Sequence, residues 1–214
     1  MDFGVLSENA GLLGAGLVVT LEISLLSIVV ASVLGVLIAT LRAAPSRTLR
    51  TIGNTYVEVL RNIPLLVHVF FLFFALPSIG IKLEAFTCGV LALGVYSSAF
   101  VGEAIRSGIA AVPTGQLEAG LASGMSYATV MRLVILPQAI AKTIPPLGNA
   151  LLNLIKNSSI VSTISVLDVL GTANLIGART FAYVPMLVGA AICYLIVTLP
   201  TAFGIHVLEK RLAR

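Results

Sequence analysis

Charged residues are scarce in this 214-residue chain: Asp, Glu, Lys and Arg make up 10% of it, against 58% hydrophobic residues. Soluble domains usually contain about 25% charged residues. A water-soluble fold of this composition would expose a large apolar surface, so the composition favours lipid as the surrounding medium. The length allows one membrane domain, residues 1–214, and leaves no room for a second globular one.

Residues that carry enzyme chemistry are also few. No Gly-x-x-x-x-Gly-Lys-Ser/Thr motif occurs, so the sequence contains no P-loop for ATP. His68 and His206 stand alone, and no Ser-His-Asp set or pair of carboxylates at catalytic spacing can be identified. Cys88 and Cys193 lie inside apolar runs, which indicates buried thiols rather than a disulfide or a metal site. We therefore predict that the chain is not an enzyme and holds no metal or cofactor of its own.

Five segments have the apolar character of membrane-spanning helices, which need about 17–25 residues. They cover residues 11–41, 62–81, 85–102, 133–155 and 180–208. Pro137, Pro145 and Pro146 are expected to interrupt the fourth of them. Residues 157–178 are less apolar and rich in Ser, Gly and Asn, so we expect a re-entrant or surface layer there. The predicted fold class is an all-α integral membrane protein, a bundle of five transmembrane helices.

The positive charges are distributed unequally between the two sides of this predicted bundle. The side with the C-terminus receives nine Lys and Arg residues and the other side three, with Lys142 inside a span. The nine are Arg42, Arg47, Arg50, Arg61, Arg106, Arg132, Lys210, Arg211 and Arg214, and the three are Lys82, Lys156 and Arg179. Because cytoplasmic loops carry an excess of Lys and Arg, we predict an outside N-terminus and a cytoplasmic C-terminus.

The loop at about residues 113–137, between the third and fourth spans, is therefore expected in the cytoplasm. Thr114 and Ser126 are predicted to cap two short helices, because their hydroxyls can accept hydrogen bonds from free backbone amides. Gly124 lies between the two helices and is expected to adopt a left-handed conformation that ends the first. The loop thus predicts a short helix, a glycine turn and a new helix just below the membrane.

Leu117, Gly120 and Leu121 are spaced three and four residues apart, which predicts one apolar face on the first short helix. An exposed apolar face of this kind needs a partner. On these grounds alone two explanations remain open. The face either contacts another protein or lies on the lipid surface.

The spacing of this loop resembles the EAA loop of ABC importer permeases, whose pattern is Glu-Ala-Ala, three residues, Gly, nine residues and Ile-x-Leu-Pro. Here the pattern reads Glu118-Ala119-Gly120, three residues, Gly124, nine residues and Val134-Ile135-Leu136-Pro137. Gly120 and Val134 depart from it, each by a small apolar replacement. The runs YVEVLRNIPLL at 56–66, FVGEAIRSGI at 100–109 and LIKNSSIVSTISVLD at 154–168 also resemble segments of polar amino acid permeases.

The resemblance, which covers about residues 15–210, implies a type I ABC importer permease in the bacterial cytoplasmic membrane. Its loop would be a coupling helix that docks into an ATPase subunit through Leu117, Glu118, Ala119, Gly120, Leu121, Gly124, Leu136 and Pro137. It also implies two cytoplasmic ATPases that hold ATP and Mg, a second identical or homologous permease and an extracellular binding protein, with membrane lipid around the chain and no nucleic acid. The substrate would be a polar amino acid. The Lys-Asn-Ser-Ser run and the Thr-Leu-Pro of the last span resemble actinobacterial glutamate permeases.

An ion-coupled secondary amino acid transporter is the alternative, and it would be expected to show inverted repeats with matching broken helices. No such pair of segments is recognisable in the sequence. A membrane scaffold without transport is a third reading, against which the EAA-like spacing argues.

Polar residues inside membrane spans are candidates for a transport pathway, because burying them in lipid is costly. The candidates are Glu22, Glu103, Asn149, Asn153, Lys156, Asn157, Ser158 and Asp168. Asn149, Asn153 and Lys156 or Asn157 recur every three to four residues and so share one helix face. Such a stripe either lines a pathway or forms hydrogen bonds between helices. Glu103 has a simpler explanation too, an ion pair with Arg106 one turn later.

Overall fold

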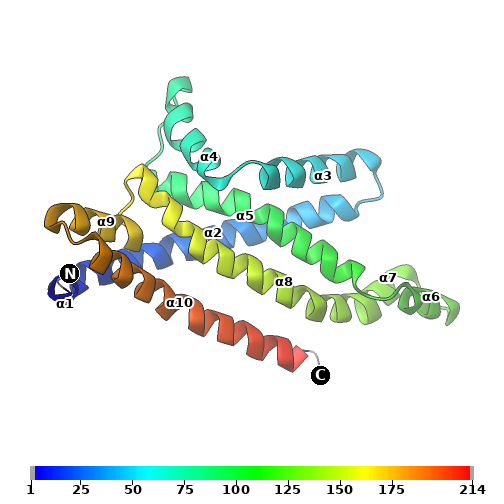
Figure 1. Ribbon diagram of the computed structural model, residues 1–214. Helices are drawn as coiled ribbons and strands as arrows, with labels where there is room; N and C mark the ends of the chain where they lie inside the picture. Colours follow the sequence, from blue (N-terminus) through cyan, green and yellow to red (C-terminus); the bar gives the residue numbers. More distant parts are fainter. Residues whose placement is uncertain (1–2, 213–214) are drawn as a thin grey trace.

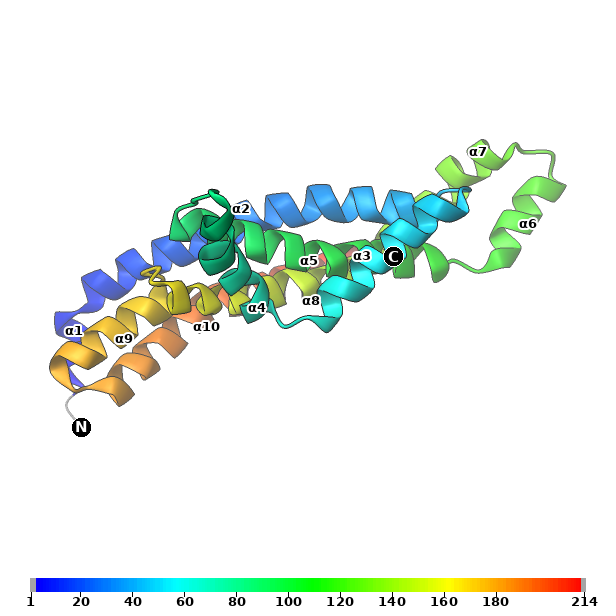
Figure 2. The ribbon, with the colours of Figure 1, turned by 90° about the horizontal axis from the view of Figure 1, so that it is seen from above.

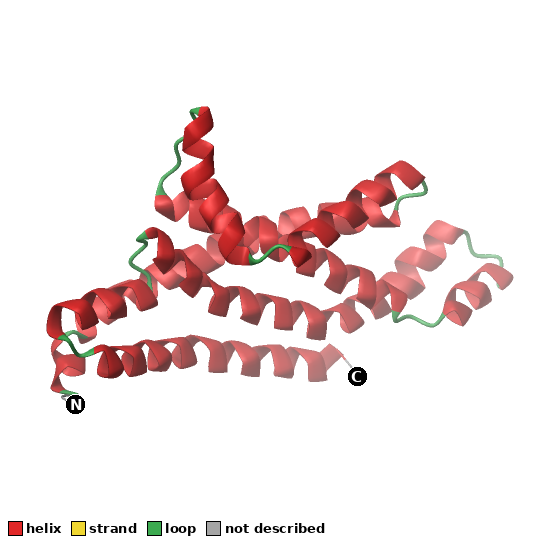
Figure 3. Cartoon of the chain, turned by 45° about the horizontal axis from the view of Figure 1, so that its top comes forward, coloured by secondary structure: helices red, strands yellow, loops and turns green. Residues whose placement is uncertain are grey.

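The computed structural model describes residues 3–212, and all its regular elements in that range are helical. The helices form an elongated bundle, with the N-terminus at one end and α6 and α7 at the other (Figures 1 and 2). They are α1 (Gly4–Glu8), α2 (Ala10–Ala43), α3 (Arg47–Asn62), α4 (Leu65–Phe70), α5 (Ala85–Ala110), α6 (Thr114–Ala122), α7 (Tyr127–Val130), α8 (Leu136–Asn157), α9 (Val169–Thr180) and α10 (Tyr183–Leu212). The predicted all-α class is confirmed (Figure 3). Arg214, which contributes to the predicted charge asymmetry, lies outside the described residues.

The two helices at the centre of the bundle, α2 and α5, approach each other through glycines. A Cβ atom on Gly35 of α2 would lie 2.5 Å from Cγ1 of Val101 on α5. In the opposite sense, a Cβ atom on Gly94 of α5 would lie 2.6 Å from Cβ of Val30 on α2. Small residues at membrane helix interfaces let backbones come this close, and here they bring α2 and α5 together.

The chain bends sharply between α3 and α4. The two helical segments, Arg47–Asn62 and Leu65–Ile79, meet at 99°. Ile63 is extended, with φ −99° and ψ 129°, because Pro64 after it disfavours the helical conformation. Beyond the bend, α4 continues through a π-helical turn and a 3₁₀ turn and projects away from the bundle (Figure 1). The second span predicted at 62–81 is thus only the second segment of a bent pair of helices. The first segment, α3, was not predicted from the sequence.

The fourth predicted span is continuously helical despite its prolines. A π-helical turn, Met131–Ile135, immediately precedes Pro137, which stands in the first turn of α8. Pro145 and Pro146 lie inside α8 and remove two backbone donors without ending the helix. The predicted interruption of this span is therefore wrong. Leu154, nearly fully buried in the core with Ile23 and Leu93, shows that packing holds the helix in place.

Residues 157–178, for which a re-entrant or surface layer was predicted, form a 3₁₀ segment and most of α9. The chain turns at Ser165, whose φ is +65°, and α9 then runs at 45° to the helix before it. Five residues of α9 are buried, and its cluster includes Leu13 of α2 and Met186 of α10. The segment is a packed layer at the N-terminal end of the bundle (Figure 1).

Three helices are long and apolar enough to cross a membrane, namely α2, α5 and α10. Two bent pairs bring the number to five if each pair counts as one span. They are Arg47–Asn62 with Leu65–Ile79, and Tyr127–Ile164 with Val169–Thr180. The predicted five-span bundle agrees with this upper count.

Candidate functional site: a polar groove and a docking helix

The loop at the end of the bundle far from the N-terminus folds as two short helices. Ser126 caps the second one, and its Oγ accepts a hydrogen bond from the Thr129 amide at 3.2 Å. Gly124 has a φ of +82°, the left-handed conformation that its position predicts. The prediction that Thr114 caps α6 is wrong, because Thr114 is the first helical residue and Pro113 occupies the N-cap position without a side-chain hydrogen bond.

The predicted apolar face of α6 is divided between the interior and the surface. Leu117 is half-buried in a cluster with Val112 and Val130, and Gly120 is buried against Val130. Leu121 is 44% exposed. The surface side chains among the predicted coupling residues are Glu118, Ala119, Leu121, Leu136 and Pro137. The cause is that α7 folds back against α6. Leu117 and Gly120 therefore contact the buried cluster around Val130, although they share a helical face with the exposed Leu121.

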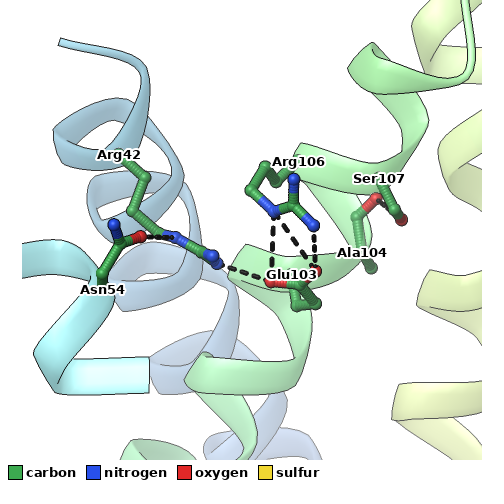
Figure 4. Close-up of polar contacts among 6 residues, drawn as sticks. All are labelled: Arg42, Asn54, Glu103, Ala104, Arg106 and Ser107. Carbon is green, nitrogen blue, oxygen red and sulfur yellow. Dashed lines mark hydrogen bonds and ion pairs between the residues drawn. The ribbon is translucent and has the colours of Figure 1, made fainter. Parts of the chain in front are cut away.

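A charged network ties α2, α3 and α5 together (Figure 4). Arg42 donates from Nη1 to Oε2 of Glu103 at 2.6 Å and from Nε to Oδ1 of Asn54 at 2.8 Å. Arg106 donates from Nη2 to Oε1 of Glu103 at 2.5 Å. Both carboxylate oxygens of Glu103 are therefore held by arginines from two helices. The predicted pairing of Glu103 with Arg106 is present, and a second arginine joins it.

Beside this network lies an open polar groove between α3, α5 and α8. One cavity of about 370 Å³ is lined by Arg42, Asn54, Val57, Glu58, Arg61, Asn62 and Glu103. A second cavity of about 280 Å³ shares Arg61 and Glu103 with it and reaches Ser107, Pro146, Asn149 and Asn153. A third, of about 180 Å³, shares Phe100, Ala150 and Asn153 with the second and ends at Asn157. Because neighbouring cavities share lining residues, we treat them as one continuous groove.

Arg61 lies at the centre of this groove without a carboxylate partner among the described residues. Its Cζ is 5.4 Å from the centre of the Phe100 ring, a cation–π arrangement. Phe100 packs in turn on Tyr96, and Tyr96 on His68, with ring centres 5.1 and 5.7 Å apart. Phe100 belongs to α5, so the guanidinium is held against a helix that is long and apolar enough to cross a membrane.

Four of the predicted pathway residues line the groove, namely Glu103, Asn149, Asn153 and Asn157. Glu22 and Lys156 are exposed elsewhere on α2 and α8 and line none of these three cavities. Ser158 is buried and donates to the Ile155 carbonyl at 2.8 Å. Asp168 is buried, caps α9 through the Gly171 amide at 2.8 Å, and accepts from the Tyr194 hydroxyl at 3.1 Å. Ser158 and Asp168 thus form contacts within and between helices, and they line none of these three cavities.

The α3 wall of the groove was missed by the sequence reading. Asn54, Glu58, Arg61 and Asn62 are spaced four, three and one residue apart and share one face of α3. The adjacent face buries Gly53, Val57 and Leu60. This amphipathic period is the signal in the sequence that identifies the wall. Apolar run length alone does not reveal it, because the segment before residue 62 is too polar to qualify as part of a span.

An all-helical bundle with a polar groove along its membrane-spanning helices and a short exposed helix at one end is the architecture of a membrane transport permease. Comparison with known proteins agrees: residues 31–214 match the family described as "Binding-protein-dependent transport system inner membrane component", and the chain belongs to this family. Within it, the chain is an ABC importer permease of the polar amino acid type. Partner ATPase and substrate-binding subunits are implied by that membership.

Three similar proteins cover essentially the whole chain. The "Probable glutamine ABC transporter permease protein GlnM" of Bacillus subtilis is 42% identical over 214 residues, which is 100% of this chain and 99% of that protein. A crystal structure of an amino acid ABC transporter with histidines has a TM-score of 0.94 at 36% identity and covers 99% of both chains. An inward-facing methionine ABC transporter, MetNI, has a TM-score of 0.81 with full coverage of both chains, and its 18% identity supports the shared fold alone.

Proposed function

We propose that this chain is the permease subunit of an ATP-driven importer for glutamine-type amino acids, with the polar groove as its translocation path. The observation that carries the proposal is the groove itself, in which charged and amide side chains lie along the membrane-spanning helix α5. The α8 wall supplies Asn149, Asn153 and Asn157, which offer hydrogen-bond donors and acceptors without charge. Such a wall can both donate hydrogen bonds to, and accept them from, the side-chain amide of glutamine. The glutamine relative favours the same substrate in place of the glutamate predicted from sequence.

A second permease, identical or homologous, closes the groove in this proposal. Glu58, Arg61 and Asn153 are exposed on the surface of the single chain, although they lie against membrane-spanning helices. Lipid tails cannot satisfy charged or amide groups, so such groups face protein or a water-filled cavity. A facing permease would convert the open groove into a closed, hydrated path.

ATP hydrolysis in the partner ATPases would change the conformation of this path, with α6 transmitting the motion. Leu121 and Glu118 lie on the surface of α6 at the end of the bundle far from the N-terminus, where a docking subunit can reach them (Figure 2). The α7 segment that supports α6 continues into the helix Tyr127–Ile164, whose α8 part forms one wall of the groove. A rigid displacement of α6 would therefore reach the groove directly. An ion-coupled transporter would not need this exposed docking helix, so we do not favour that alternative.

Reconstituted transport tests the proposal. The chain is combined in vesicles with a partner ATPase, a second permease and a binding protein from the same organism, and uptake of labelled L-glutamine is followed with and without ATP. We expect accumulation only with ATP and only with all partners present. Accumulation by the chain alone under an ion gradient would instead establish the secondary transporter.

Orientation needs its own experiment. We propose an outside N-terminus, supported by the excess of Lys and Arg toward the α6 end. In a variant without Cys88 and Cys193, single cysteines are placed at Gln116 of α6 and at Phe181, which is 89% exposed at the opposite end. An impermeant thiol reagent applied to intact cells should label position 181 and spare position 116. The reverse pattern would contradict the proposed orientation.

A further inference from the structure

We propose that Glu58 and Arg61 together bind the backbone of the transported amino acid: Arg61 takes its α-carboxylate and Glu58 its α-ammonium group. This inference rests on the proposed function and names the chemical group that each side chain recognises. It concerns two residues on the α3 wall, where Glu58 and Arg61 line the same cavity of about 370 Å³.

The ionic contacts of the groove leave these two side chains free. Glu103 cannot take the ammonium group without losing a partner, because Arg42 and Arg106 hold both of its oxygens. Neither Glu58 nor Arg61 forms an ion pair among the described residues. They are thus the unpaired anion and the unpaired cation of the groove, although each is held against membrane-spanning helices, where an unpaired charge is costly.

Their spacing matches a zwitterion. Residues three apart on a helix have Cβ atoms about 5–6 Å apart and project from the same face. An α-amino acid carries its carboxylate and its ammonium on one carbon, so a single molecule can meet both side chains. The molecule's own side chain then points toward α8, where Pro146, Asn149 and Asn153 form the facing wall.

Arg61 is also positioned before substrate arrives. Its guanidinium carbon lies 5.4 Å from the centre of the Phe100 ring, a cation–π contact that restricts where the group can lie. A planar guanidinium can donate two parallel hydrogen bonds to a carboxylate. Because this contact already restricts the side chain, less conformational freedom is lost when the carboxylate binds.

Two analogues of L-glutamine separate the two roles. Glutaramate lacks the α-ammonium group, and L-glutamine α-amide lacks the α-carboxylate. Equilibrium binding of each is measured on the assembled importer in nanodiscs, without nucleotide and without binding protein, so that only the membrane site is probed. We expect the wild-type complex to prefer L-glutamine over each analogue by about tenfold or more, since charge-assisted hydrogen bonds have at least that effect.

The variants should remove one preference each. Glu58→Gln should bring the glutaramate-to-glutamine ratio of Kd close to one and keep the α-amide ratio. Arg61→Gln should do the converse, and Arg61→Lys should keep part of the α-amide preference because the charge remains. Arg47→Gln is the matched control on the same helix, and both ratios should stay at their wild-type values. Co-purification of the ATPase confirms that each variant assembles.

Other results would overturn the assignment in a defined way. Wild-type ratios in both Glu58→Gln and Arg61→Gln would show that the two residues do not read the substrate backbone. Loss of the glutaramate ratio in Glu103→Gln, but not in Glu58→Gln, would assign the ammonium to Glu103. Either outcome leaves ATP-driven glutamine uptake by the wild-type complex intact. Absence of that uptake would instead refute the proposed function itself.

Discussion

Gly120 of α6 packs directly against Val130 of α7: a Cβ atom at position 120 would lie 2.7 Å from Cγ2 and 2.9 Å from Cγ1 of Val130. Gly120 stands where the EAA pattern has alanine. The close approach gives a reason for this departure, because the β-branched Val130 is fully buried and fills the space that the alanine methyl group would need.

Gly120→Ala should therefore destabilise the packing of α6. Overfilling a packed core typically costs about 1–3 kcal/mol, since side chains or backbone must shift. We expect a lower thermal midpoint for the purified permease and weaker co-purification of the ATPase. The double variant Gly120→Ala with Val130→Ala should recover part of both, because the smaller side chain removes the clash. If the double variant is no better than the sum of the singles, the clash is not the cause.

The two leucines of α6 should respond differently to truncation. Leu121→Ala removes an exposed side chain, so the isolated permease should keep its stability while ATPase docking loses up to about 1.5–3 kcal/mol of burial. Leu117→Ala creates space in the cluster around Val130 and should lower the stability of the permease itself, by about 1–3 kcal/mol for a half-buried leucine. Thermal unfolding of the permease and affinity for the ATPase, measured side by side, distinguish the two effects. Equal loss of docking without loss of stability in both variants would restore the single apolar face predicted from sequence.

Glu118→Lys reverses a charge on the proposed docking surface of α6. It should leave the permease folded, because Glu118 is exposed and has no ion pair among the described residues. If Glu118 meets a basic or amide group of the ATPase, the variant should reduce hydrolysis stimulated by the binding protein and uptake together. Normal values of both would show that Glu118 lies outside the docking surface.

Gly124 and Gly115 form a matched pair for testing backbone conformation. At both positions a Cβ atom would meet nothing within 4 Å, but only Gly124 has a positive φ, at +82°. Gly124→Ala should cost about 1–2 kcal/mol, because a left-handed conformation is unfavourable for a residue with a Cβ atom. Gly115→Ala should be neutral or slightly stabilising, since alanine is the better helix former. Similar thermal midpoints for the two variants would argue against strain at the turn.

Glu103→Gln should destabilise the junction of α2, α3 and α5. The substitution keeps the shape of the side chain but leaves Arg42 and Arg106 without their shared carboxylate, and Arg42 is only 12% exposed. We expect a loss of about 1–3 kcal/mol, because a shielded charge that loses its partner is costly while solvent still screens Arg106. Thermal unfolding of Glu118→Gln, which removes a carboxylate without an ion pair, provides the control. Equal midpoints for the two variants would show that the network adds little to stability.

Local features of the loop at about residues 113–137 could be predicted well. The capping hydroxyl of Ser126 and the left-handed Gly124 depend on short-range geometry that neighbouring residues determine. The prediction for Thr114 failed because a helix start depends on where the chain leaves α5, and Pro113 takes the capping position. Leu117 was placed on the docking face because helical periodicity shows which residues share a face, but not what that face meets.

Composition and apolar run length by themselves determined that the chain is a helical membrane protein, because lipid leaves few ways to satisfy backbone hydrogen bonds. The spacing of the loop, by its resemblance to known permeases, indicated the transporter family. Only the tertiary structure decided which polar residues meet. Packing of α2 on α5 brings Arg42 and Glu103, 61 positions apart, into an ion pair, and the bend at Pro64 keeps α3 beside them, where Asn54 also binds Arg42. The ion pair occupies Glu103, whereas Glu58 and Arg61 have no ion-pair partner among the described residues. Which charges are paired depends on distances between helices, and the periodicity of a single helix cannot predict it.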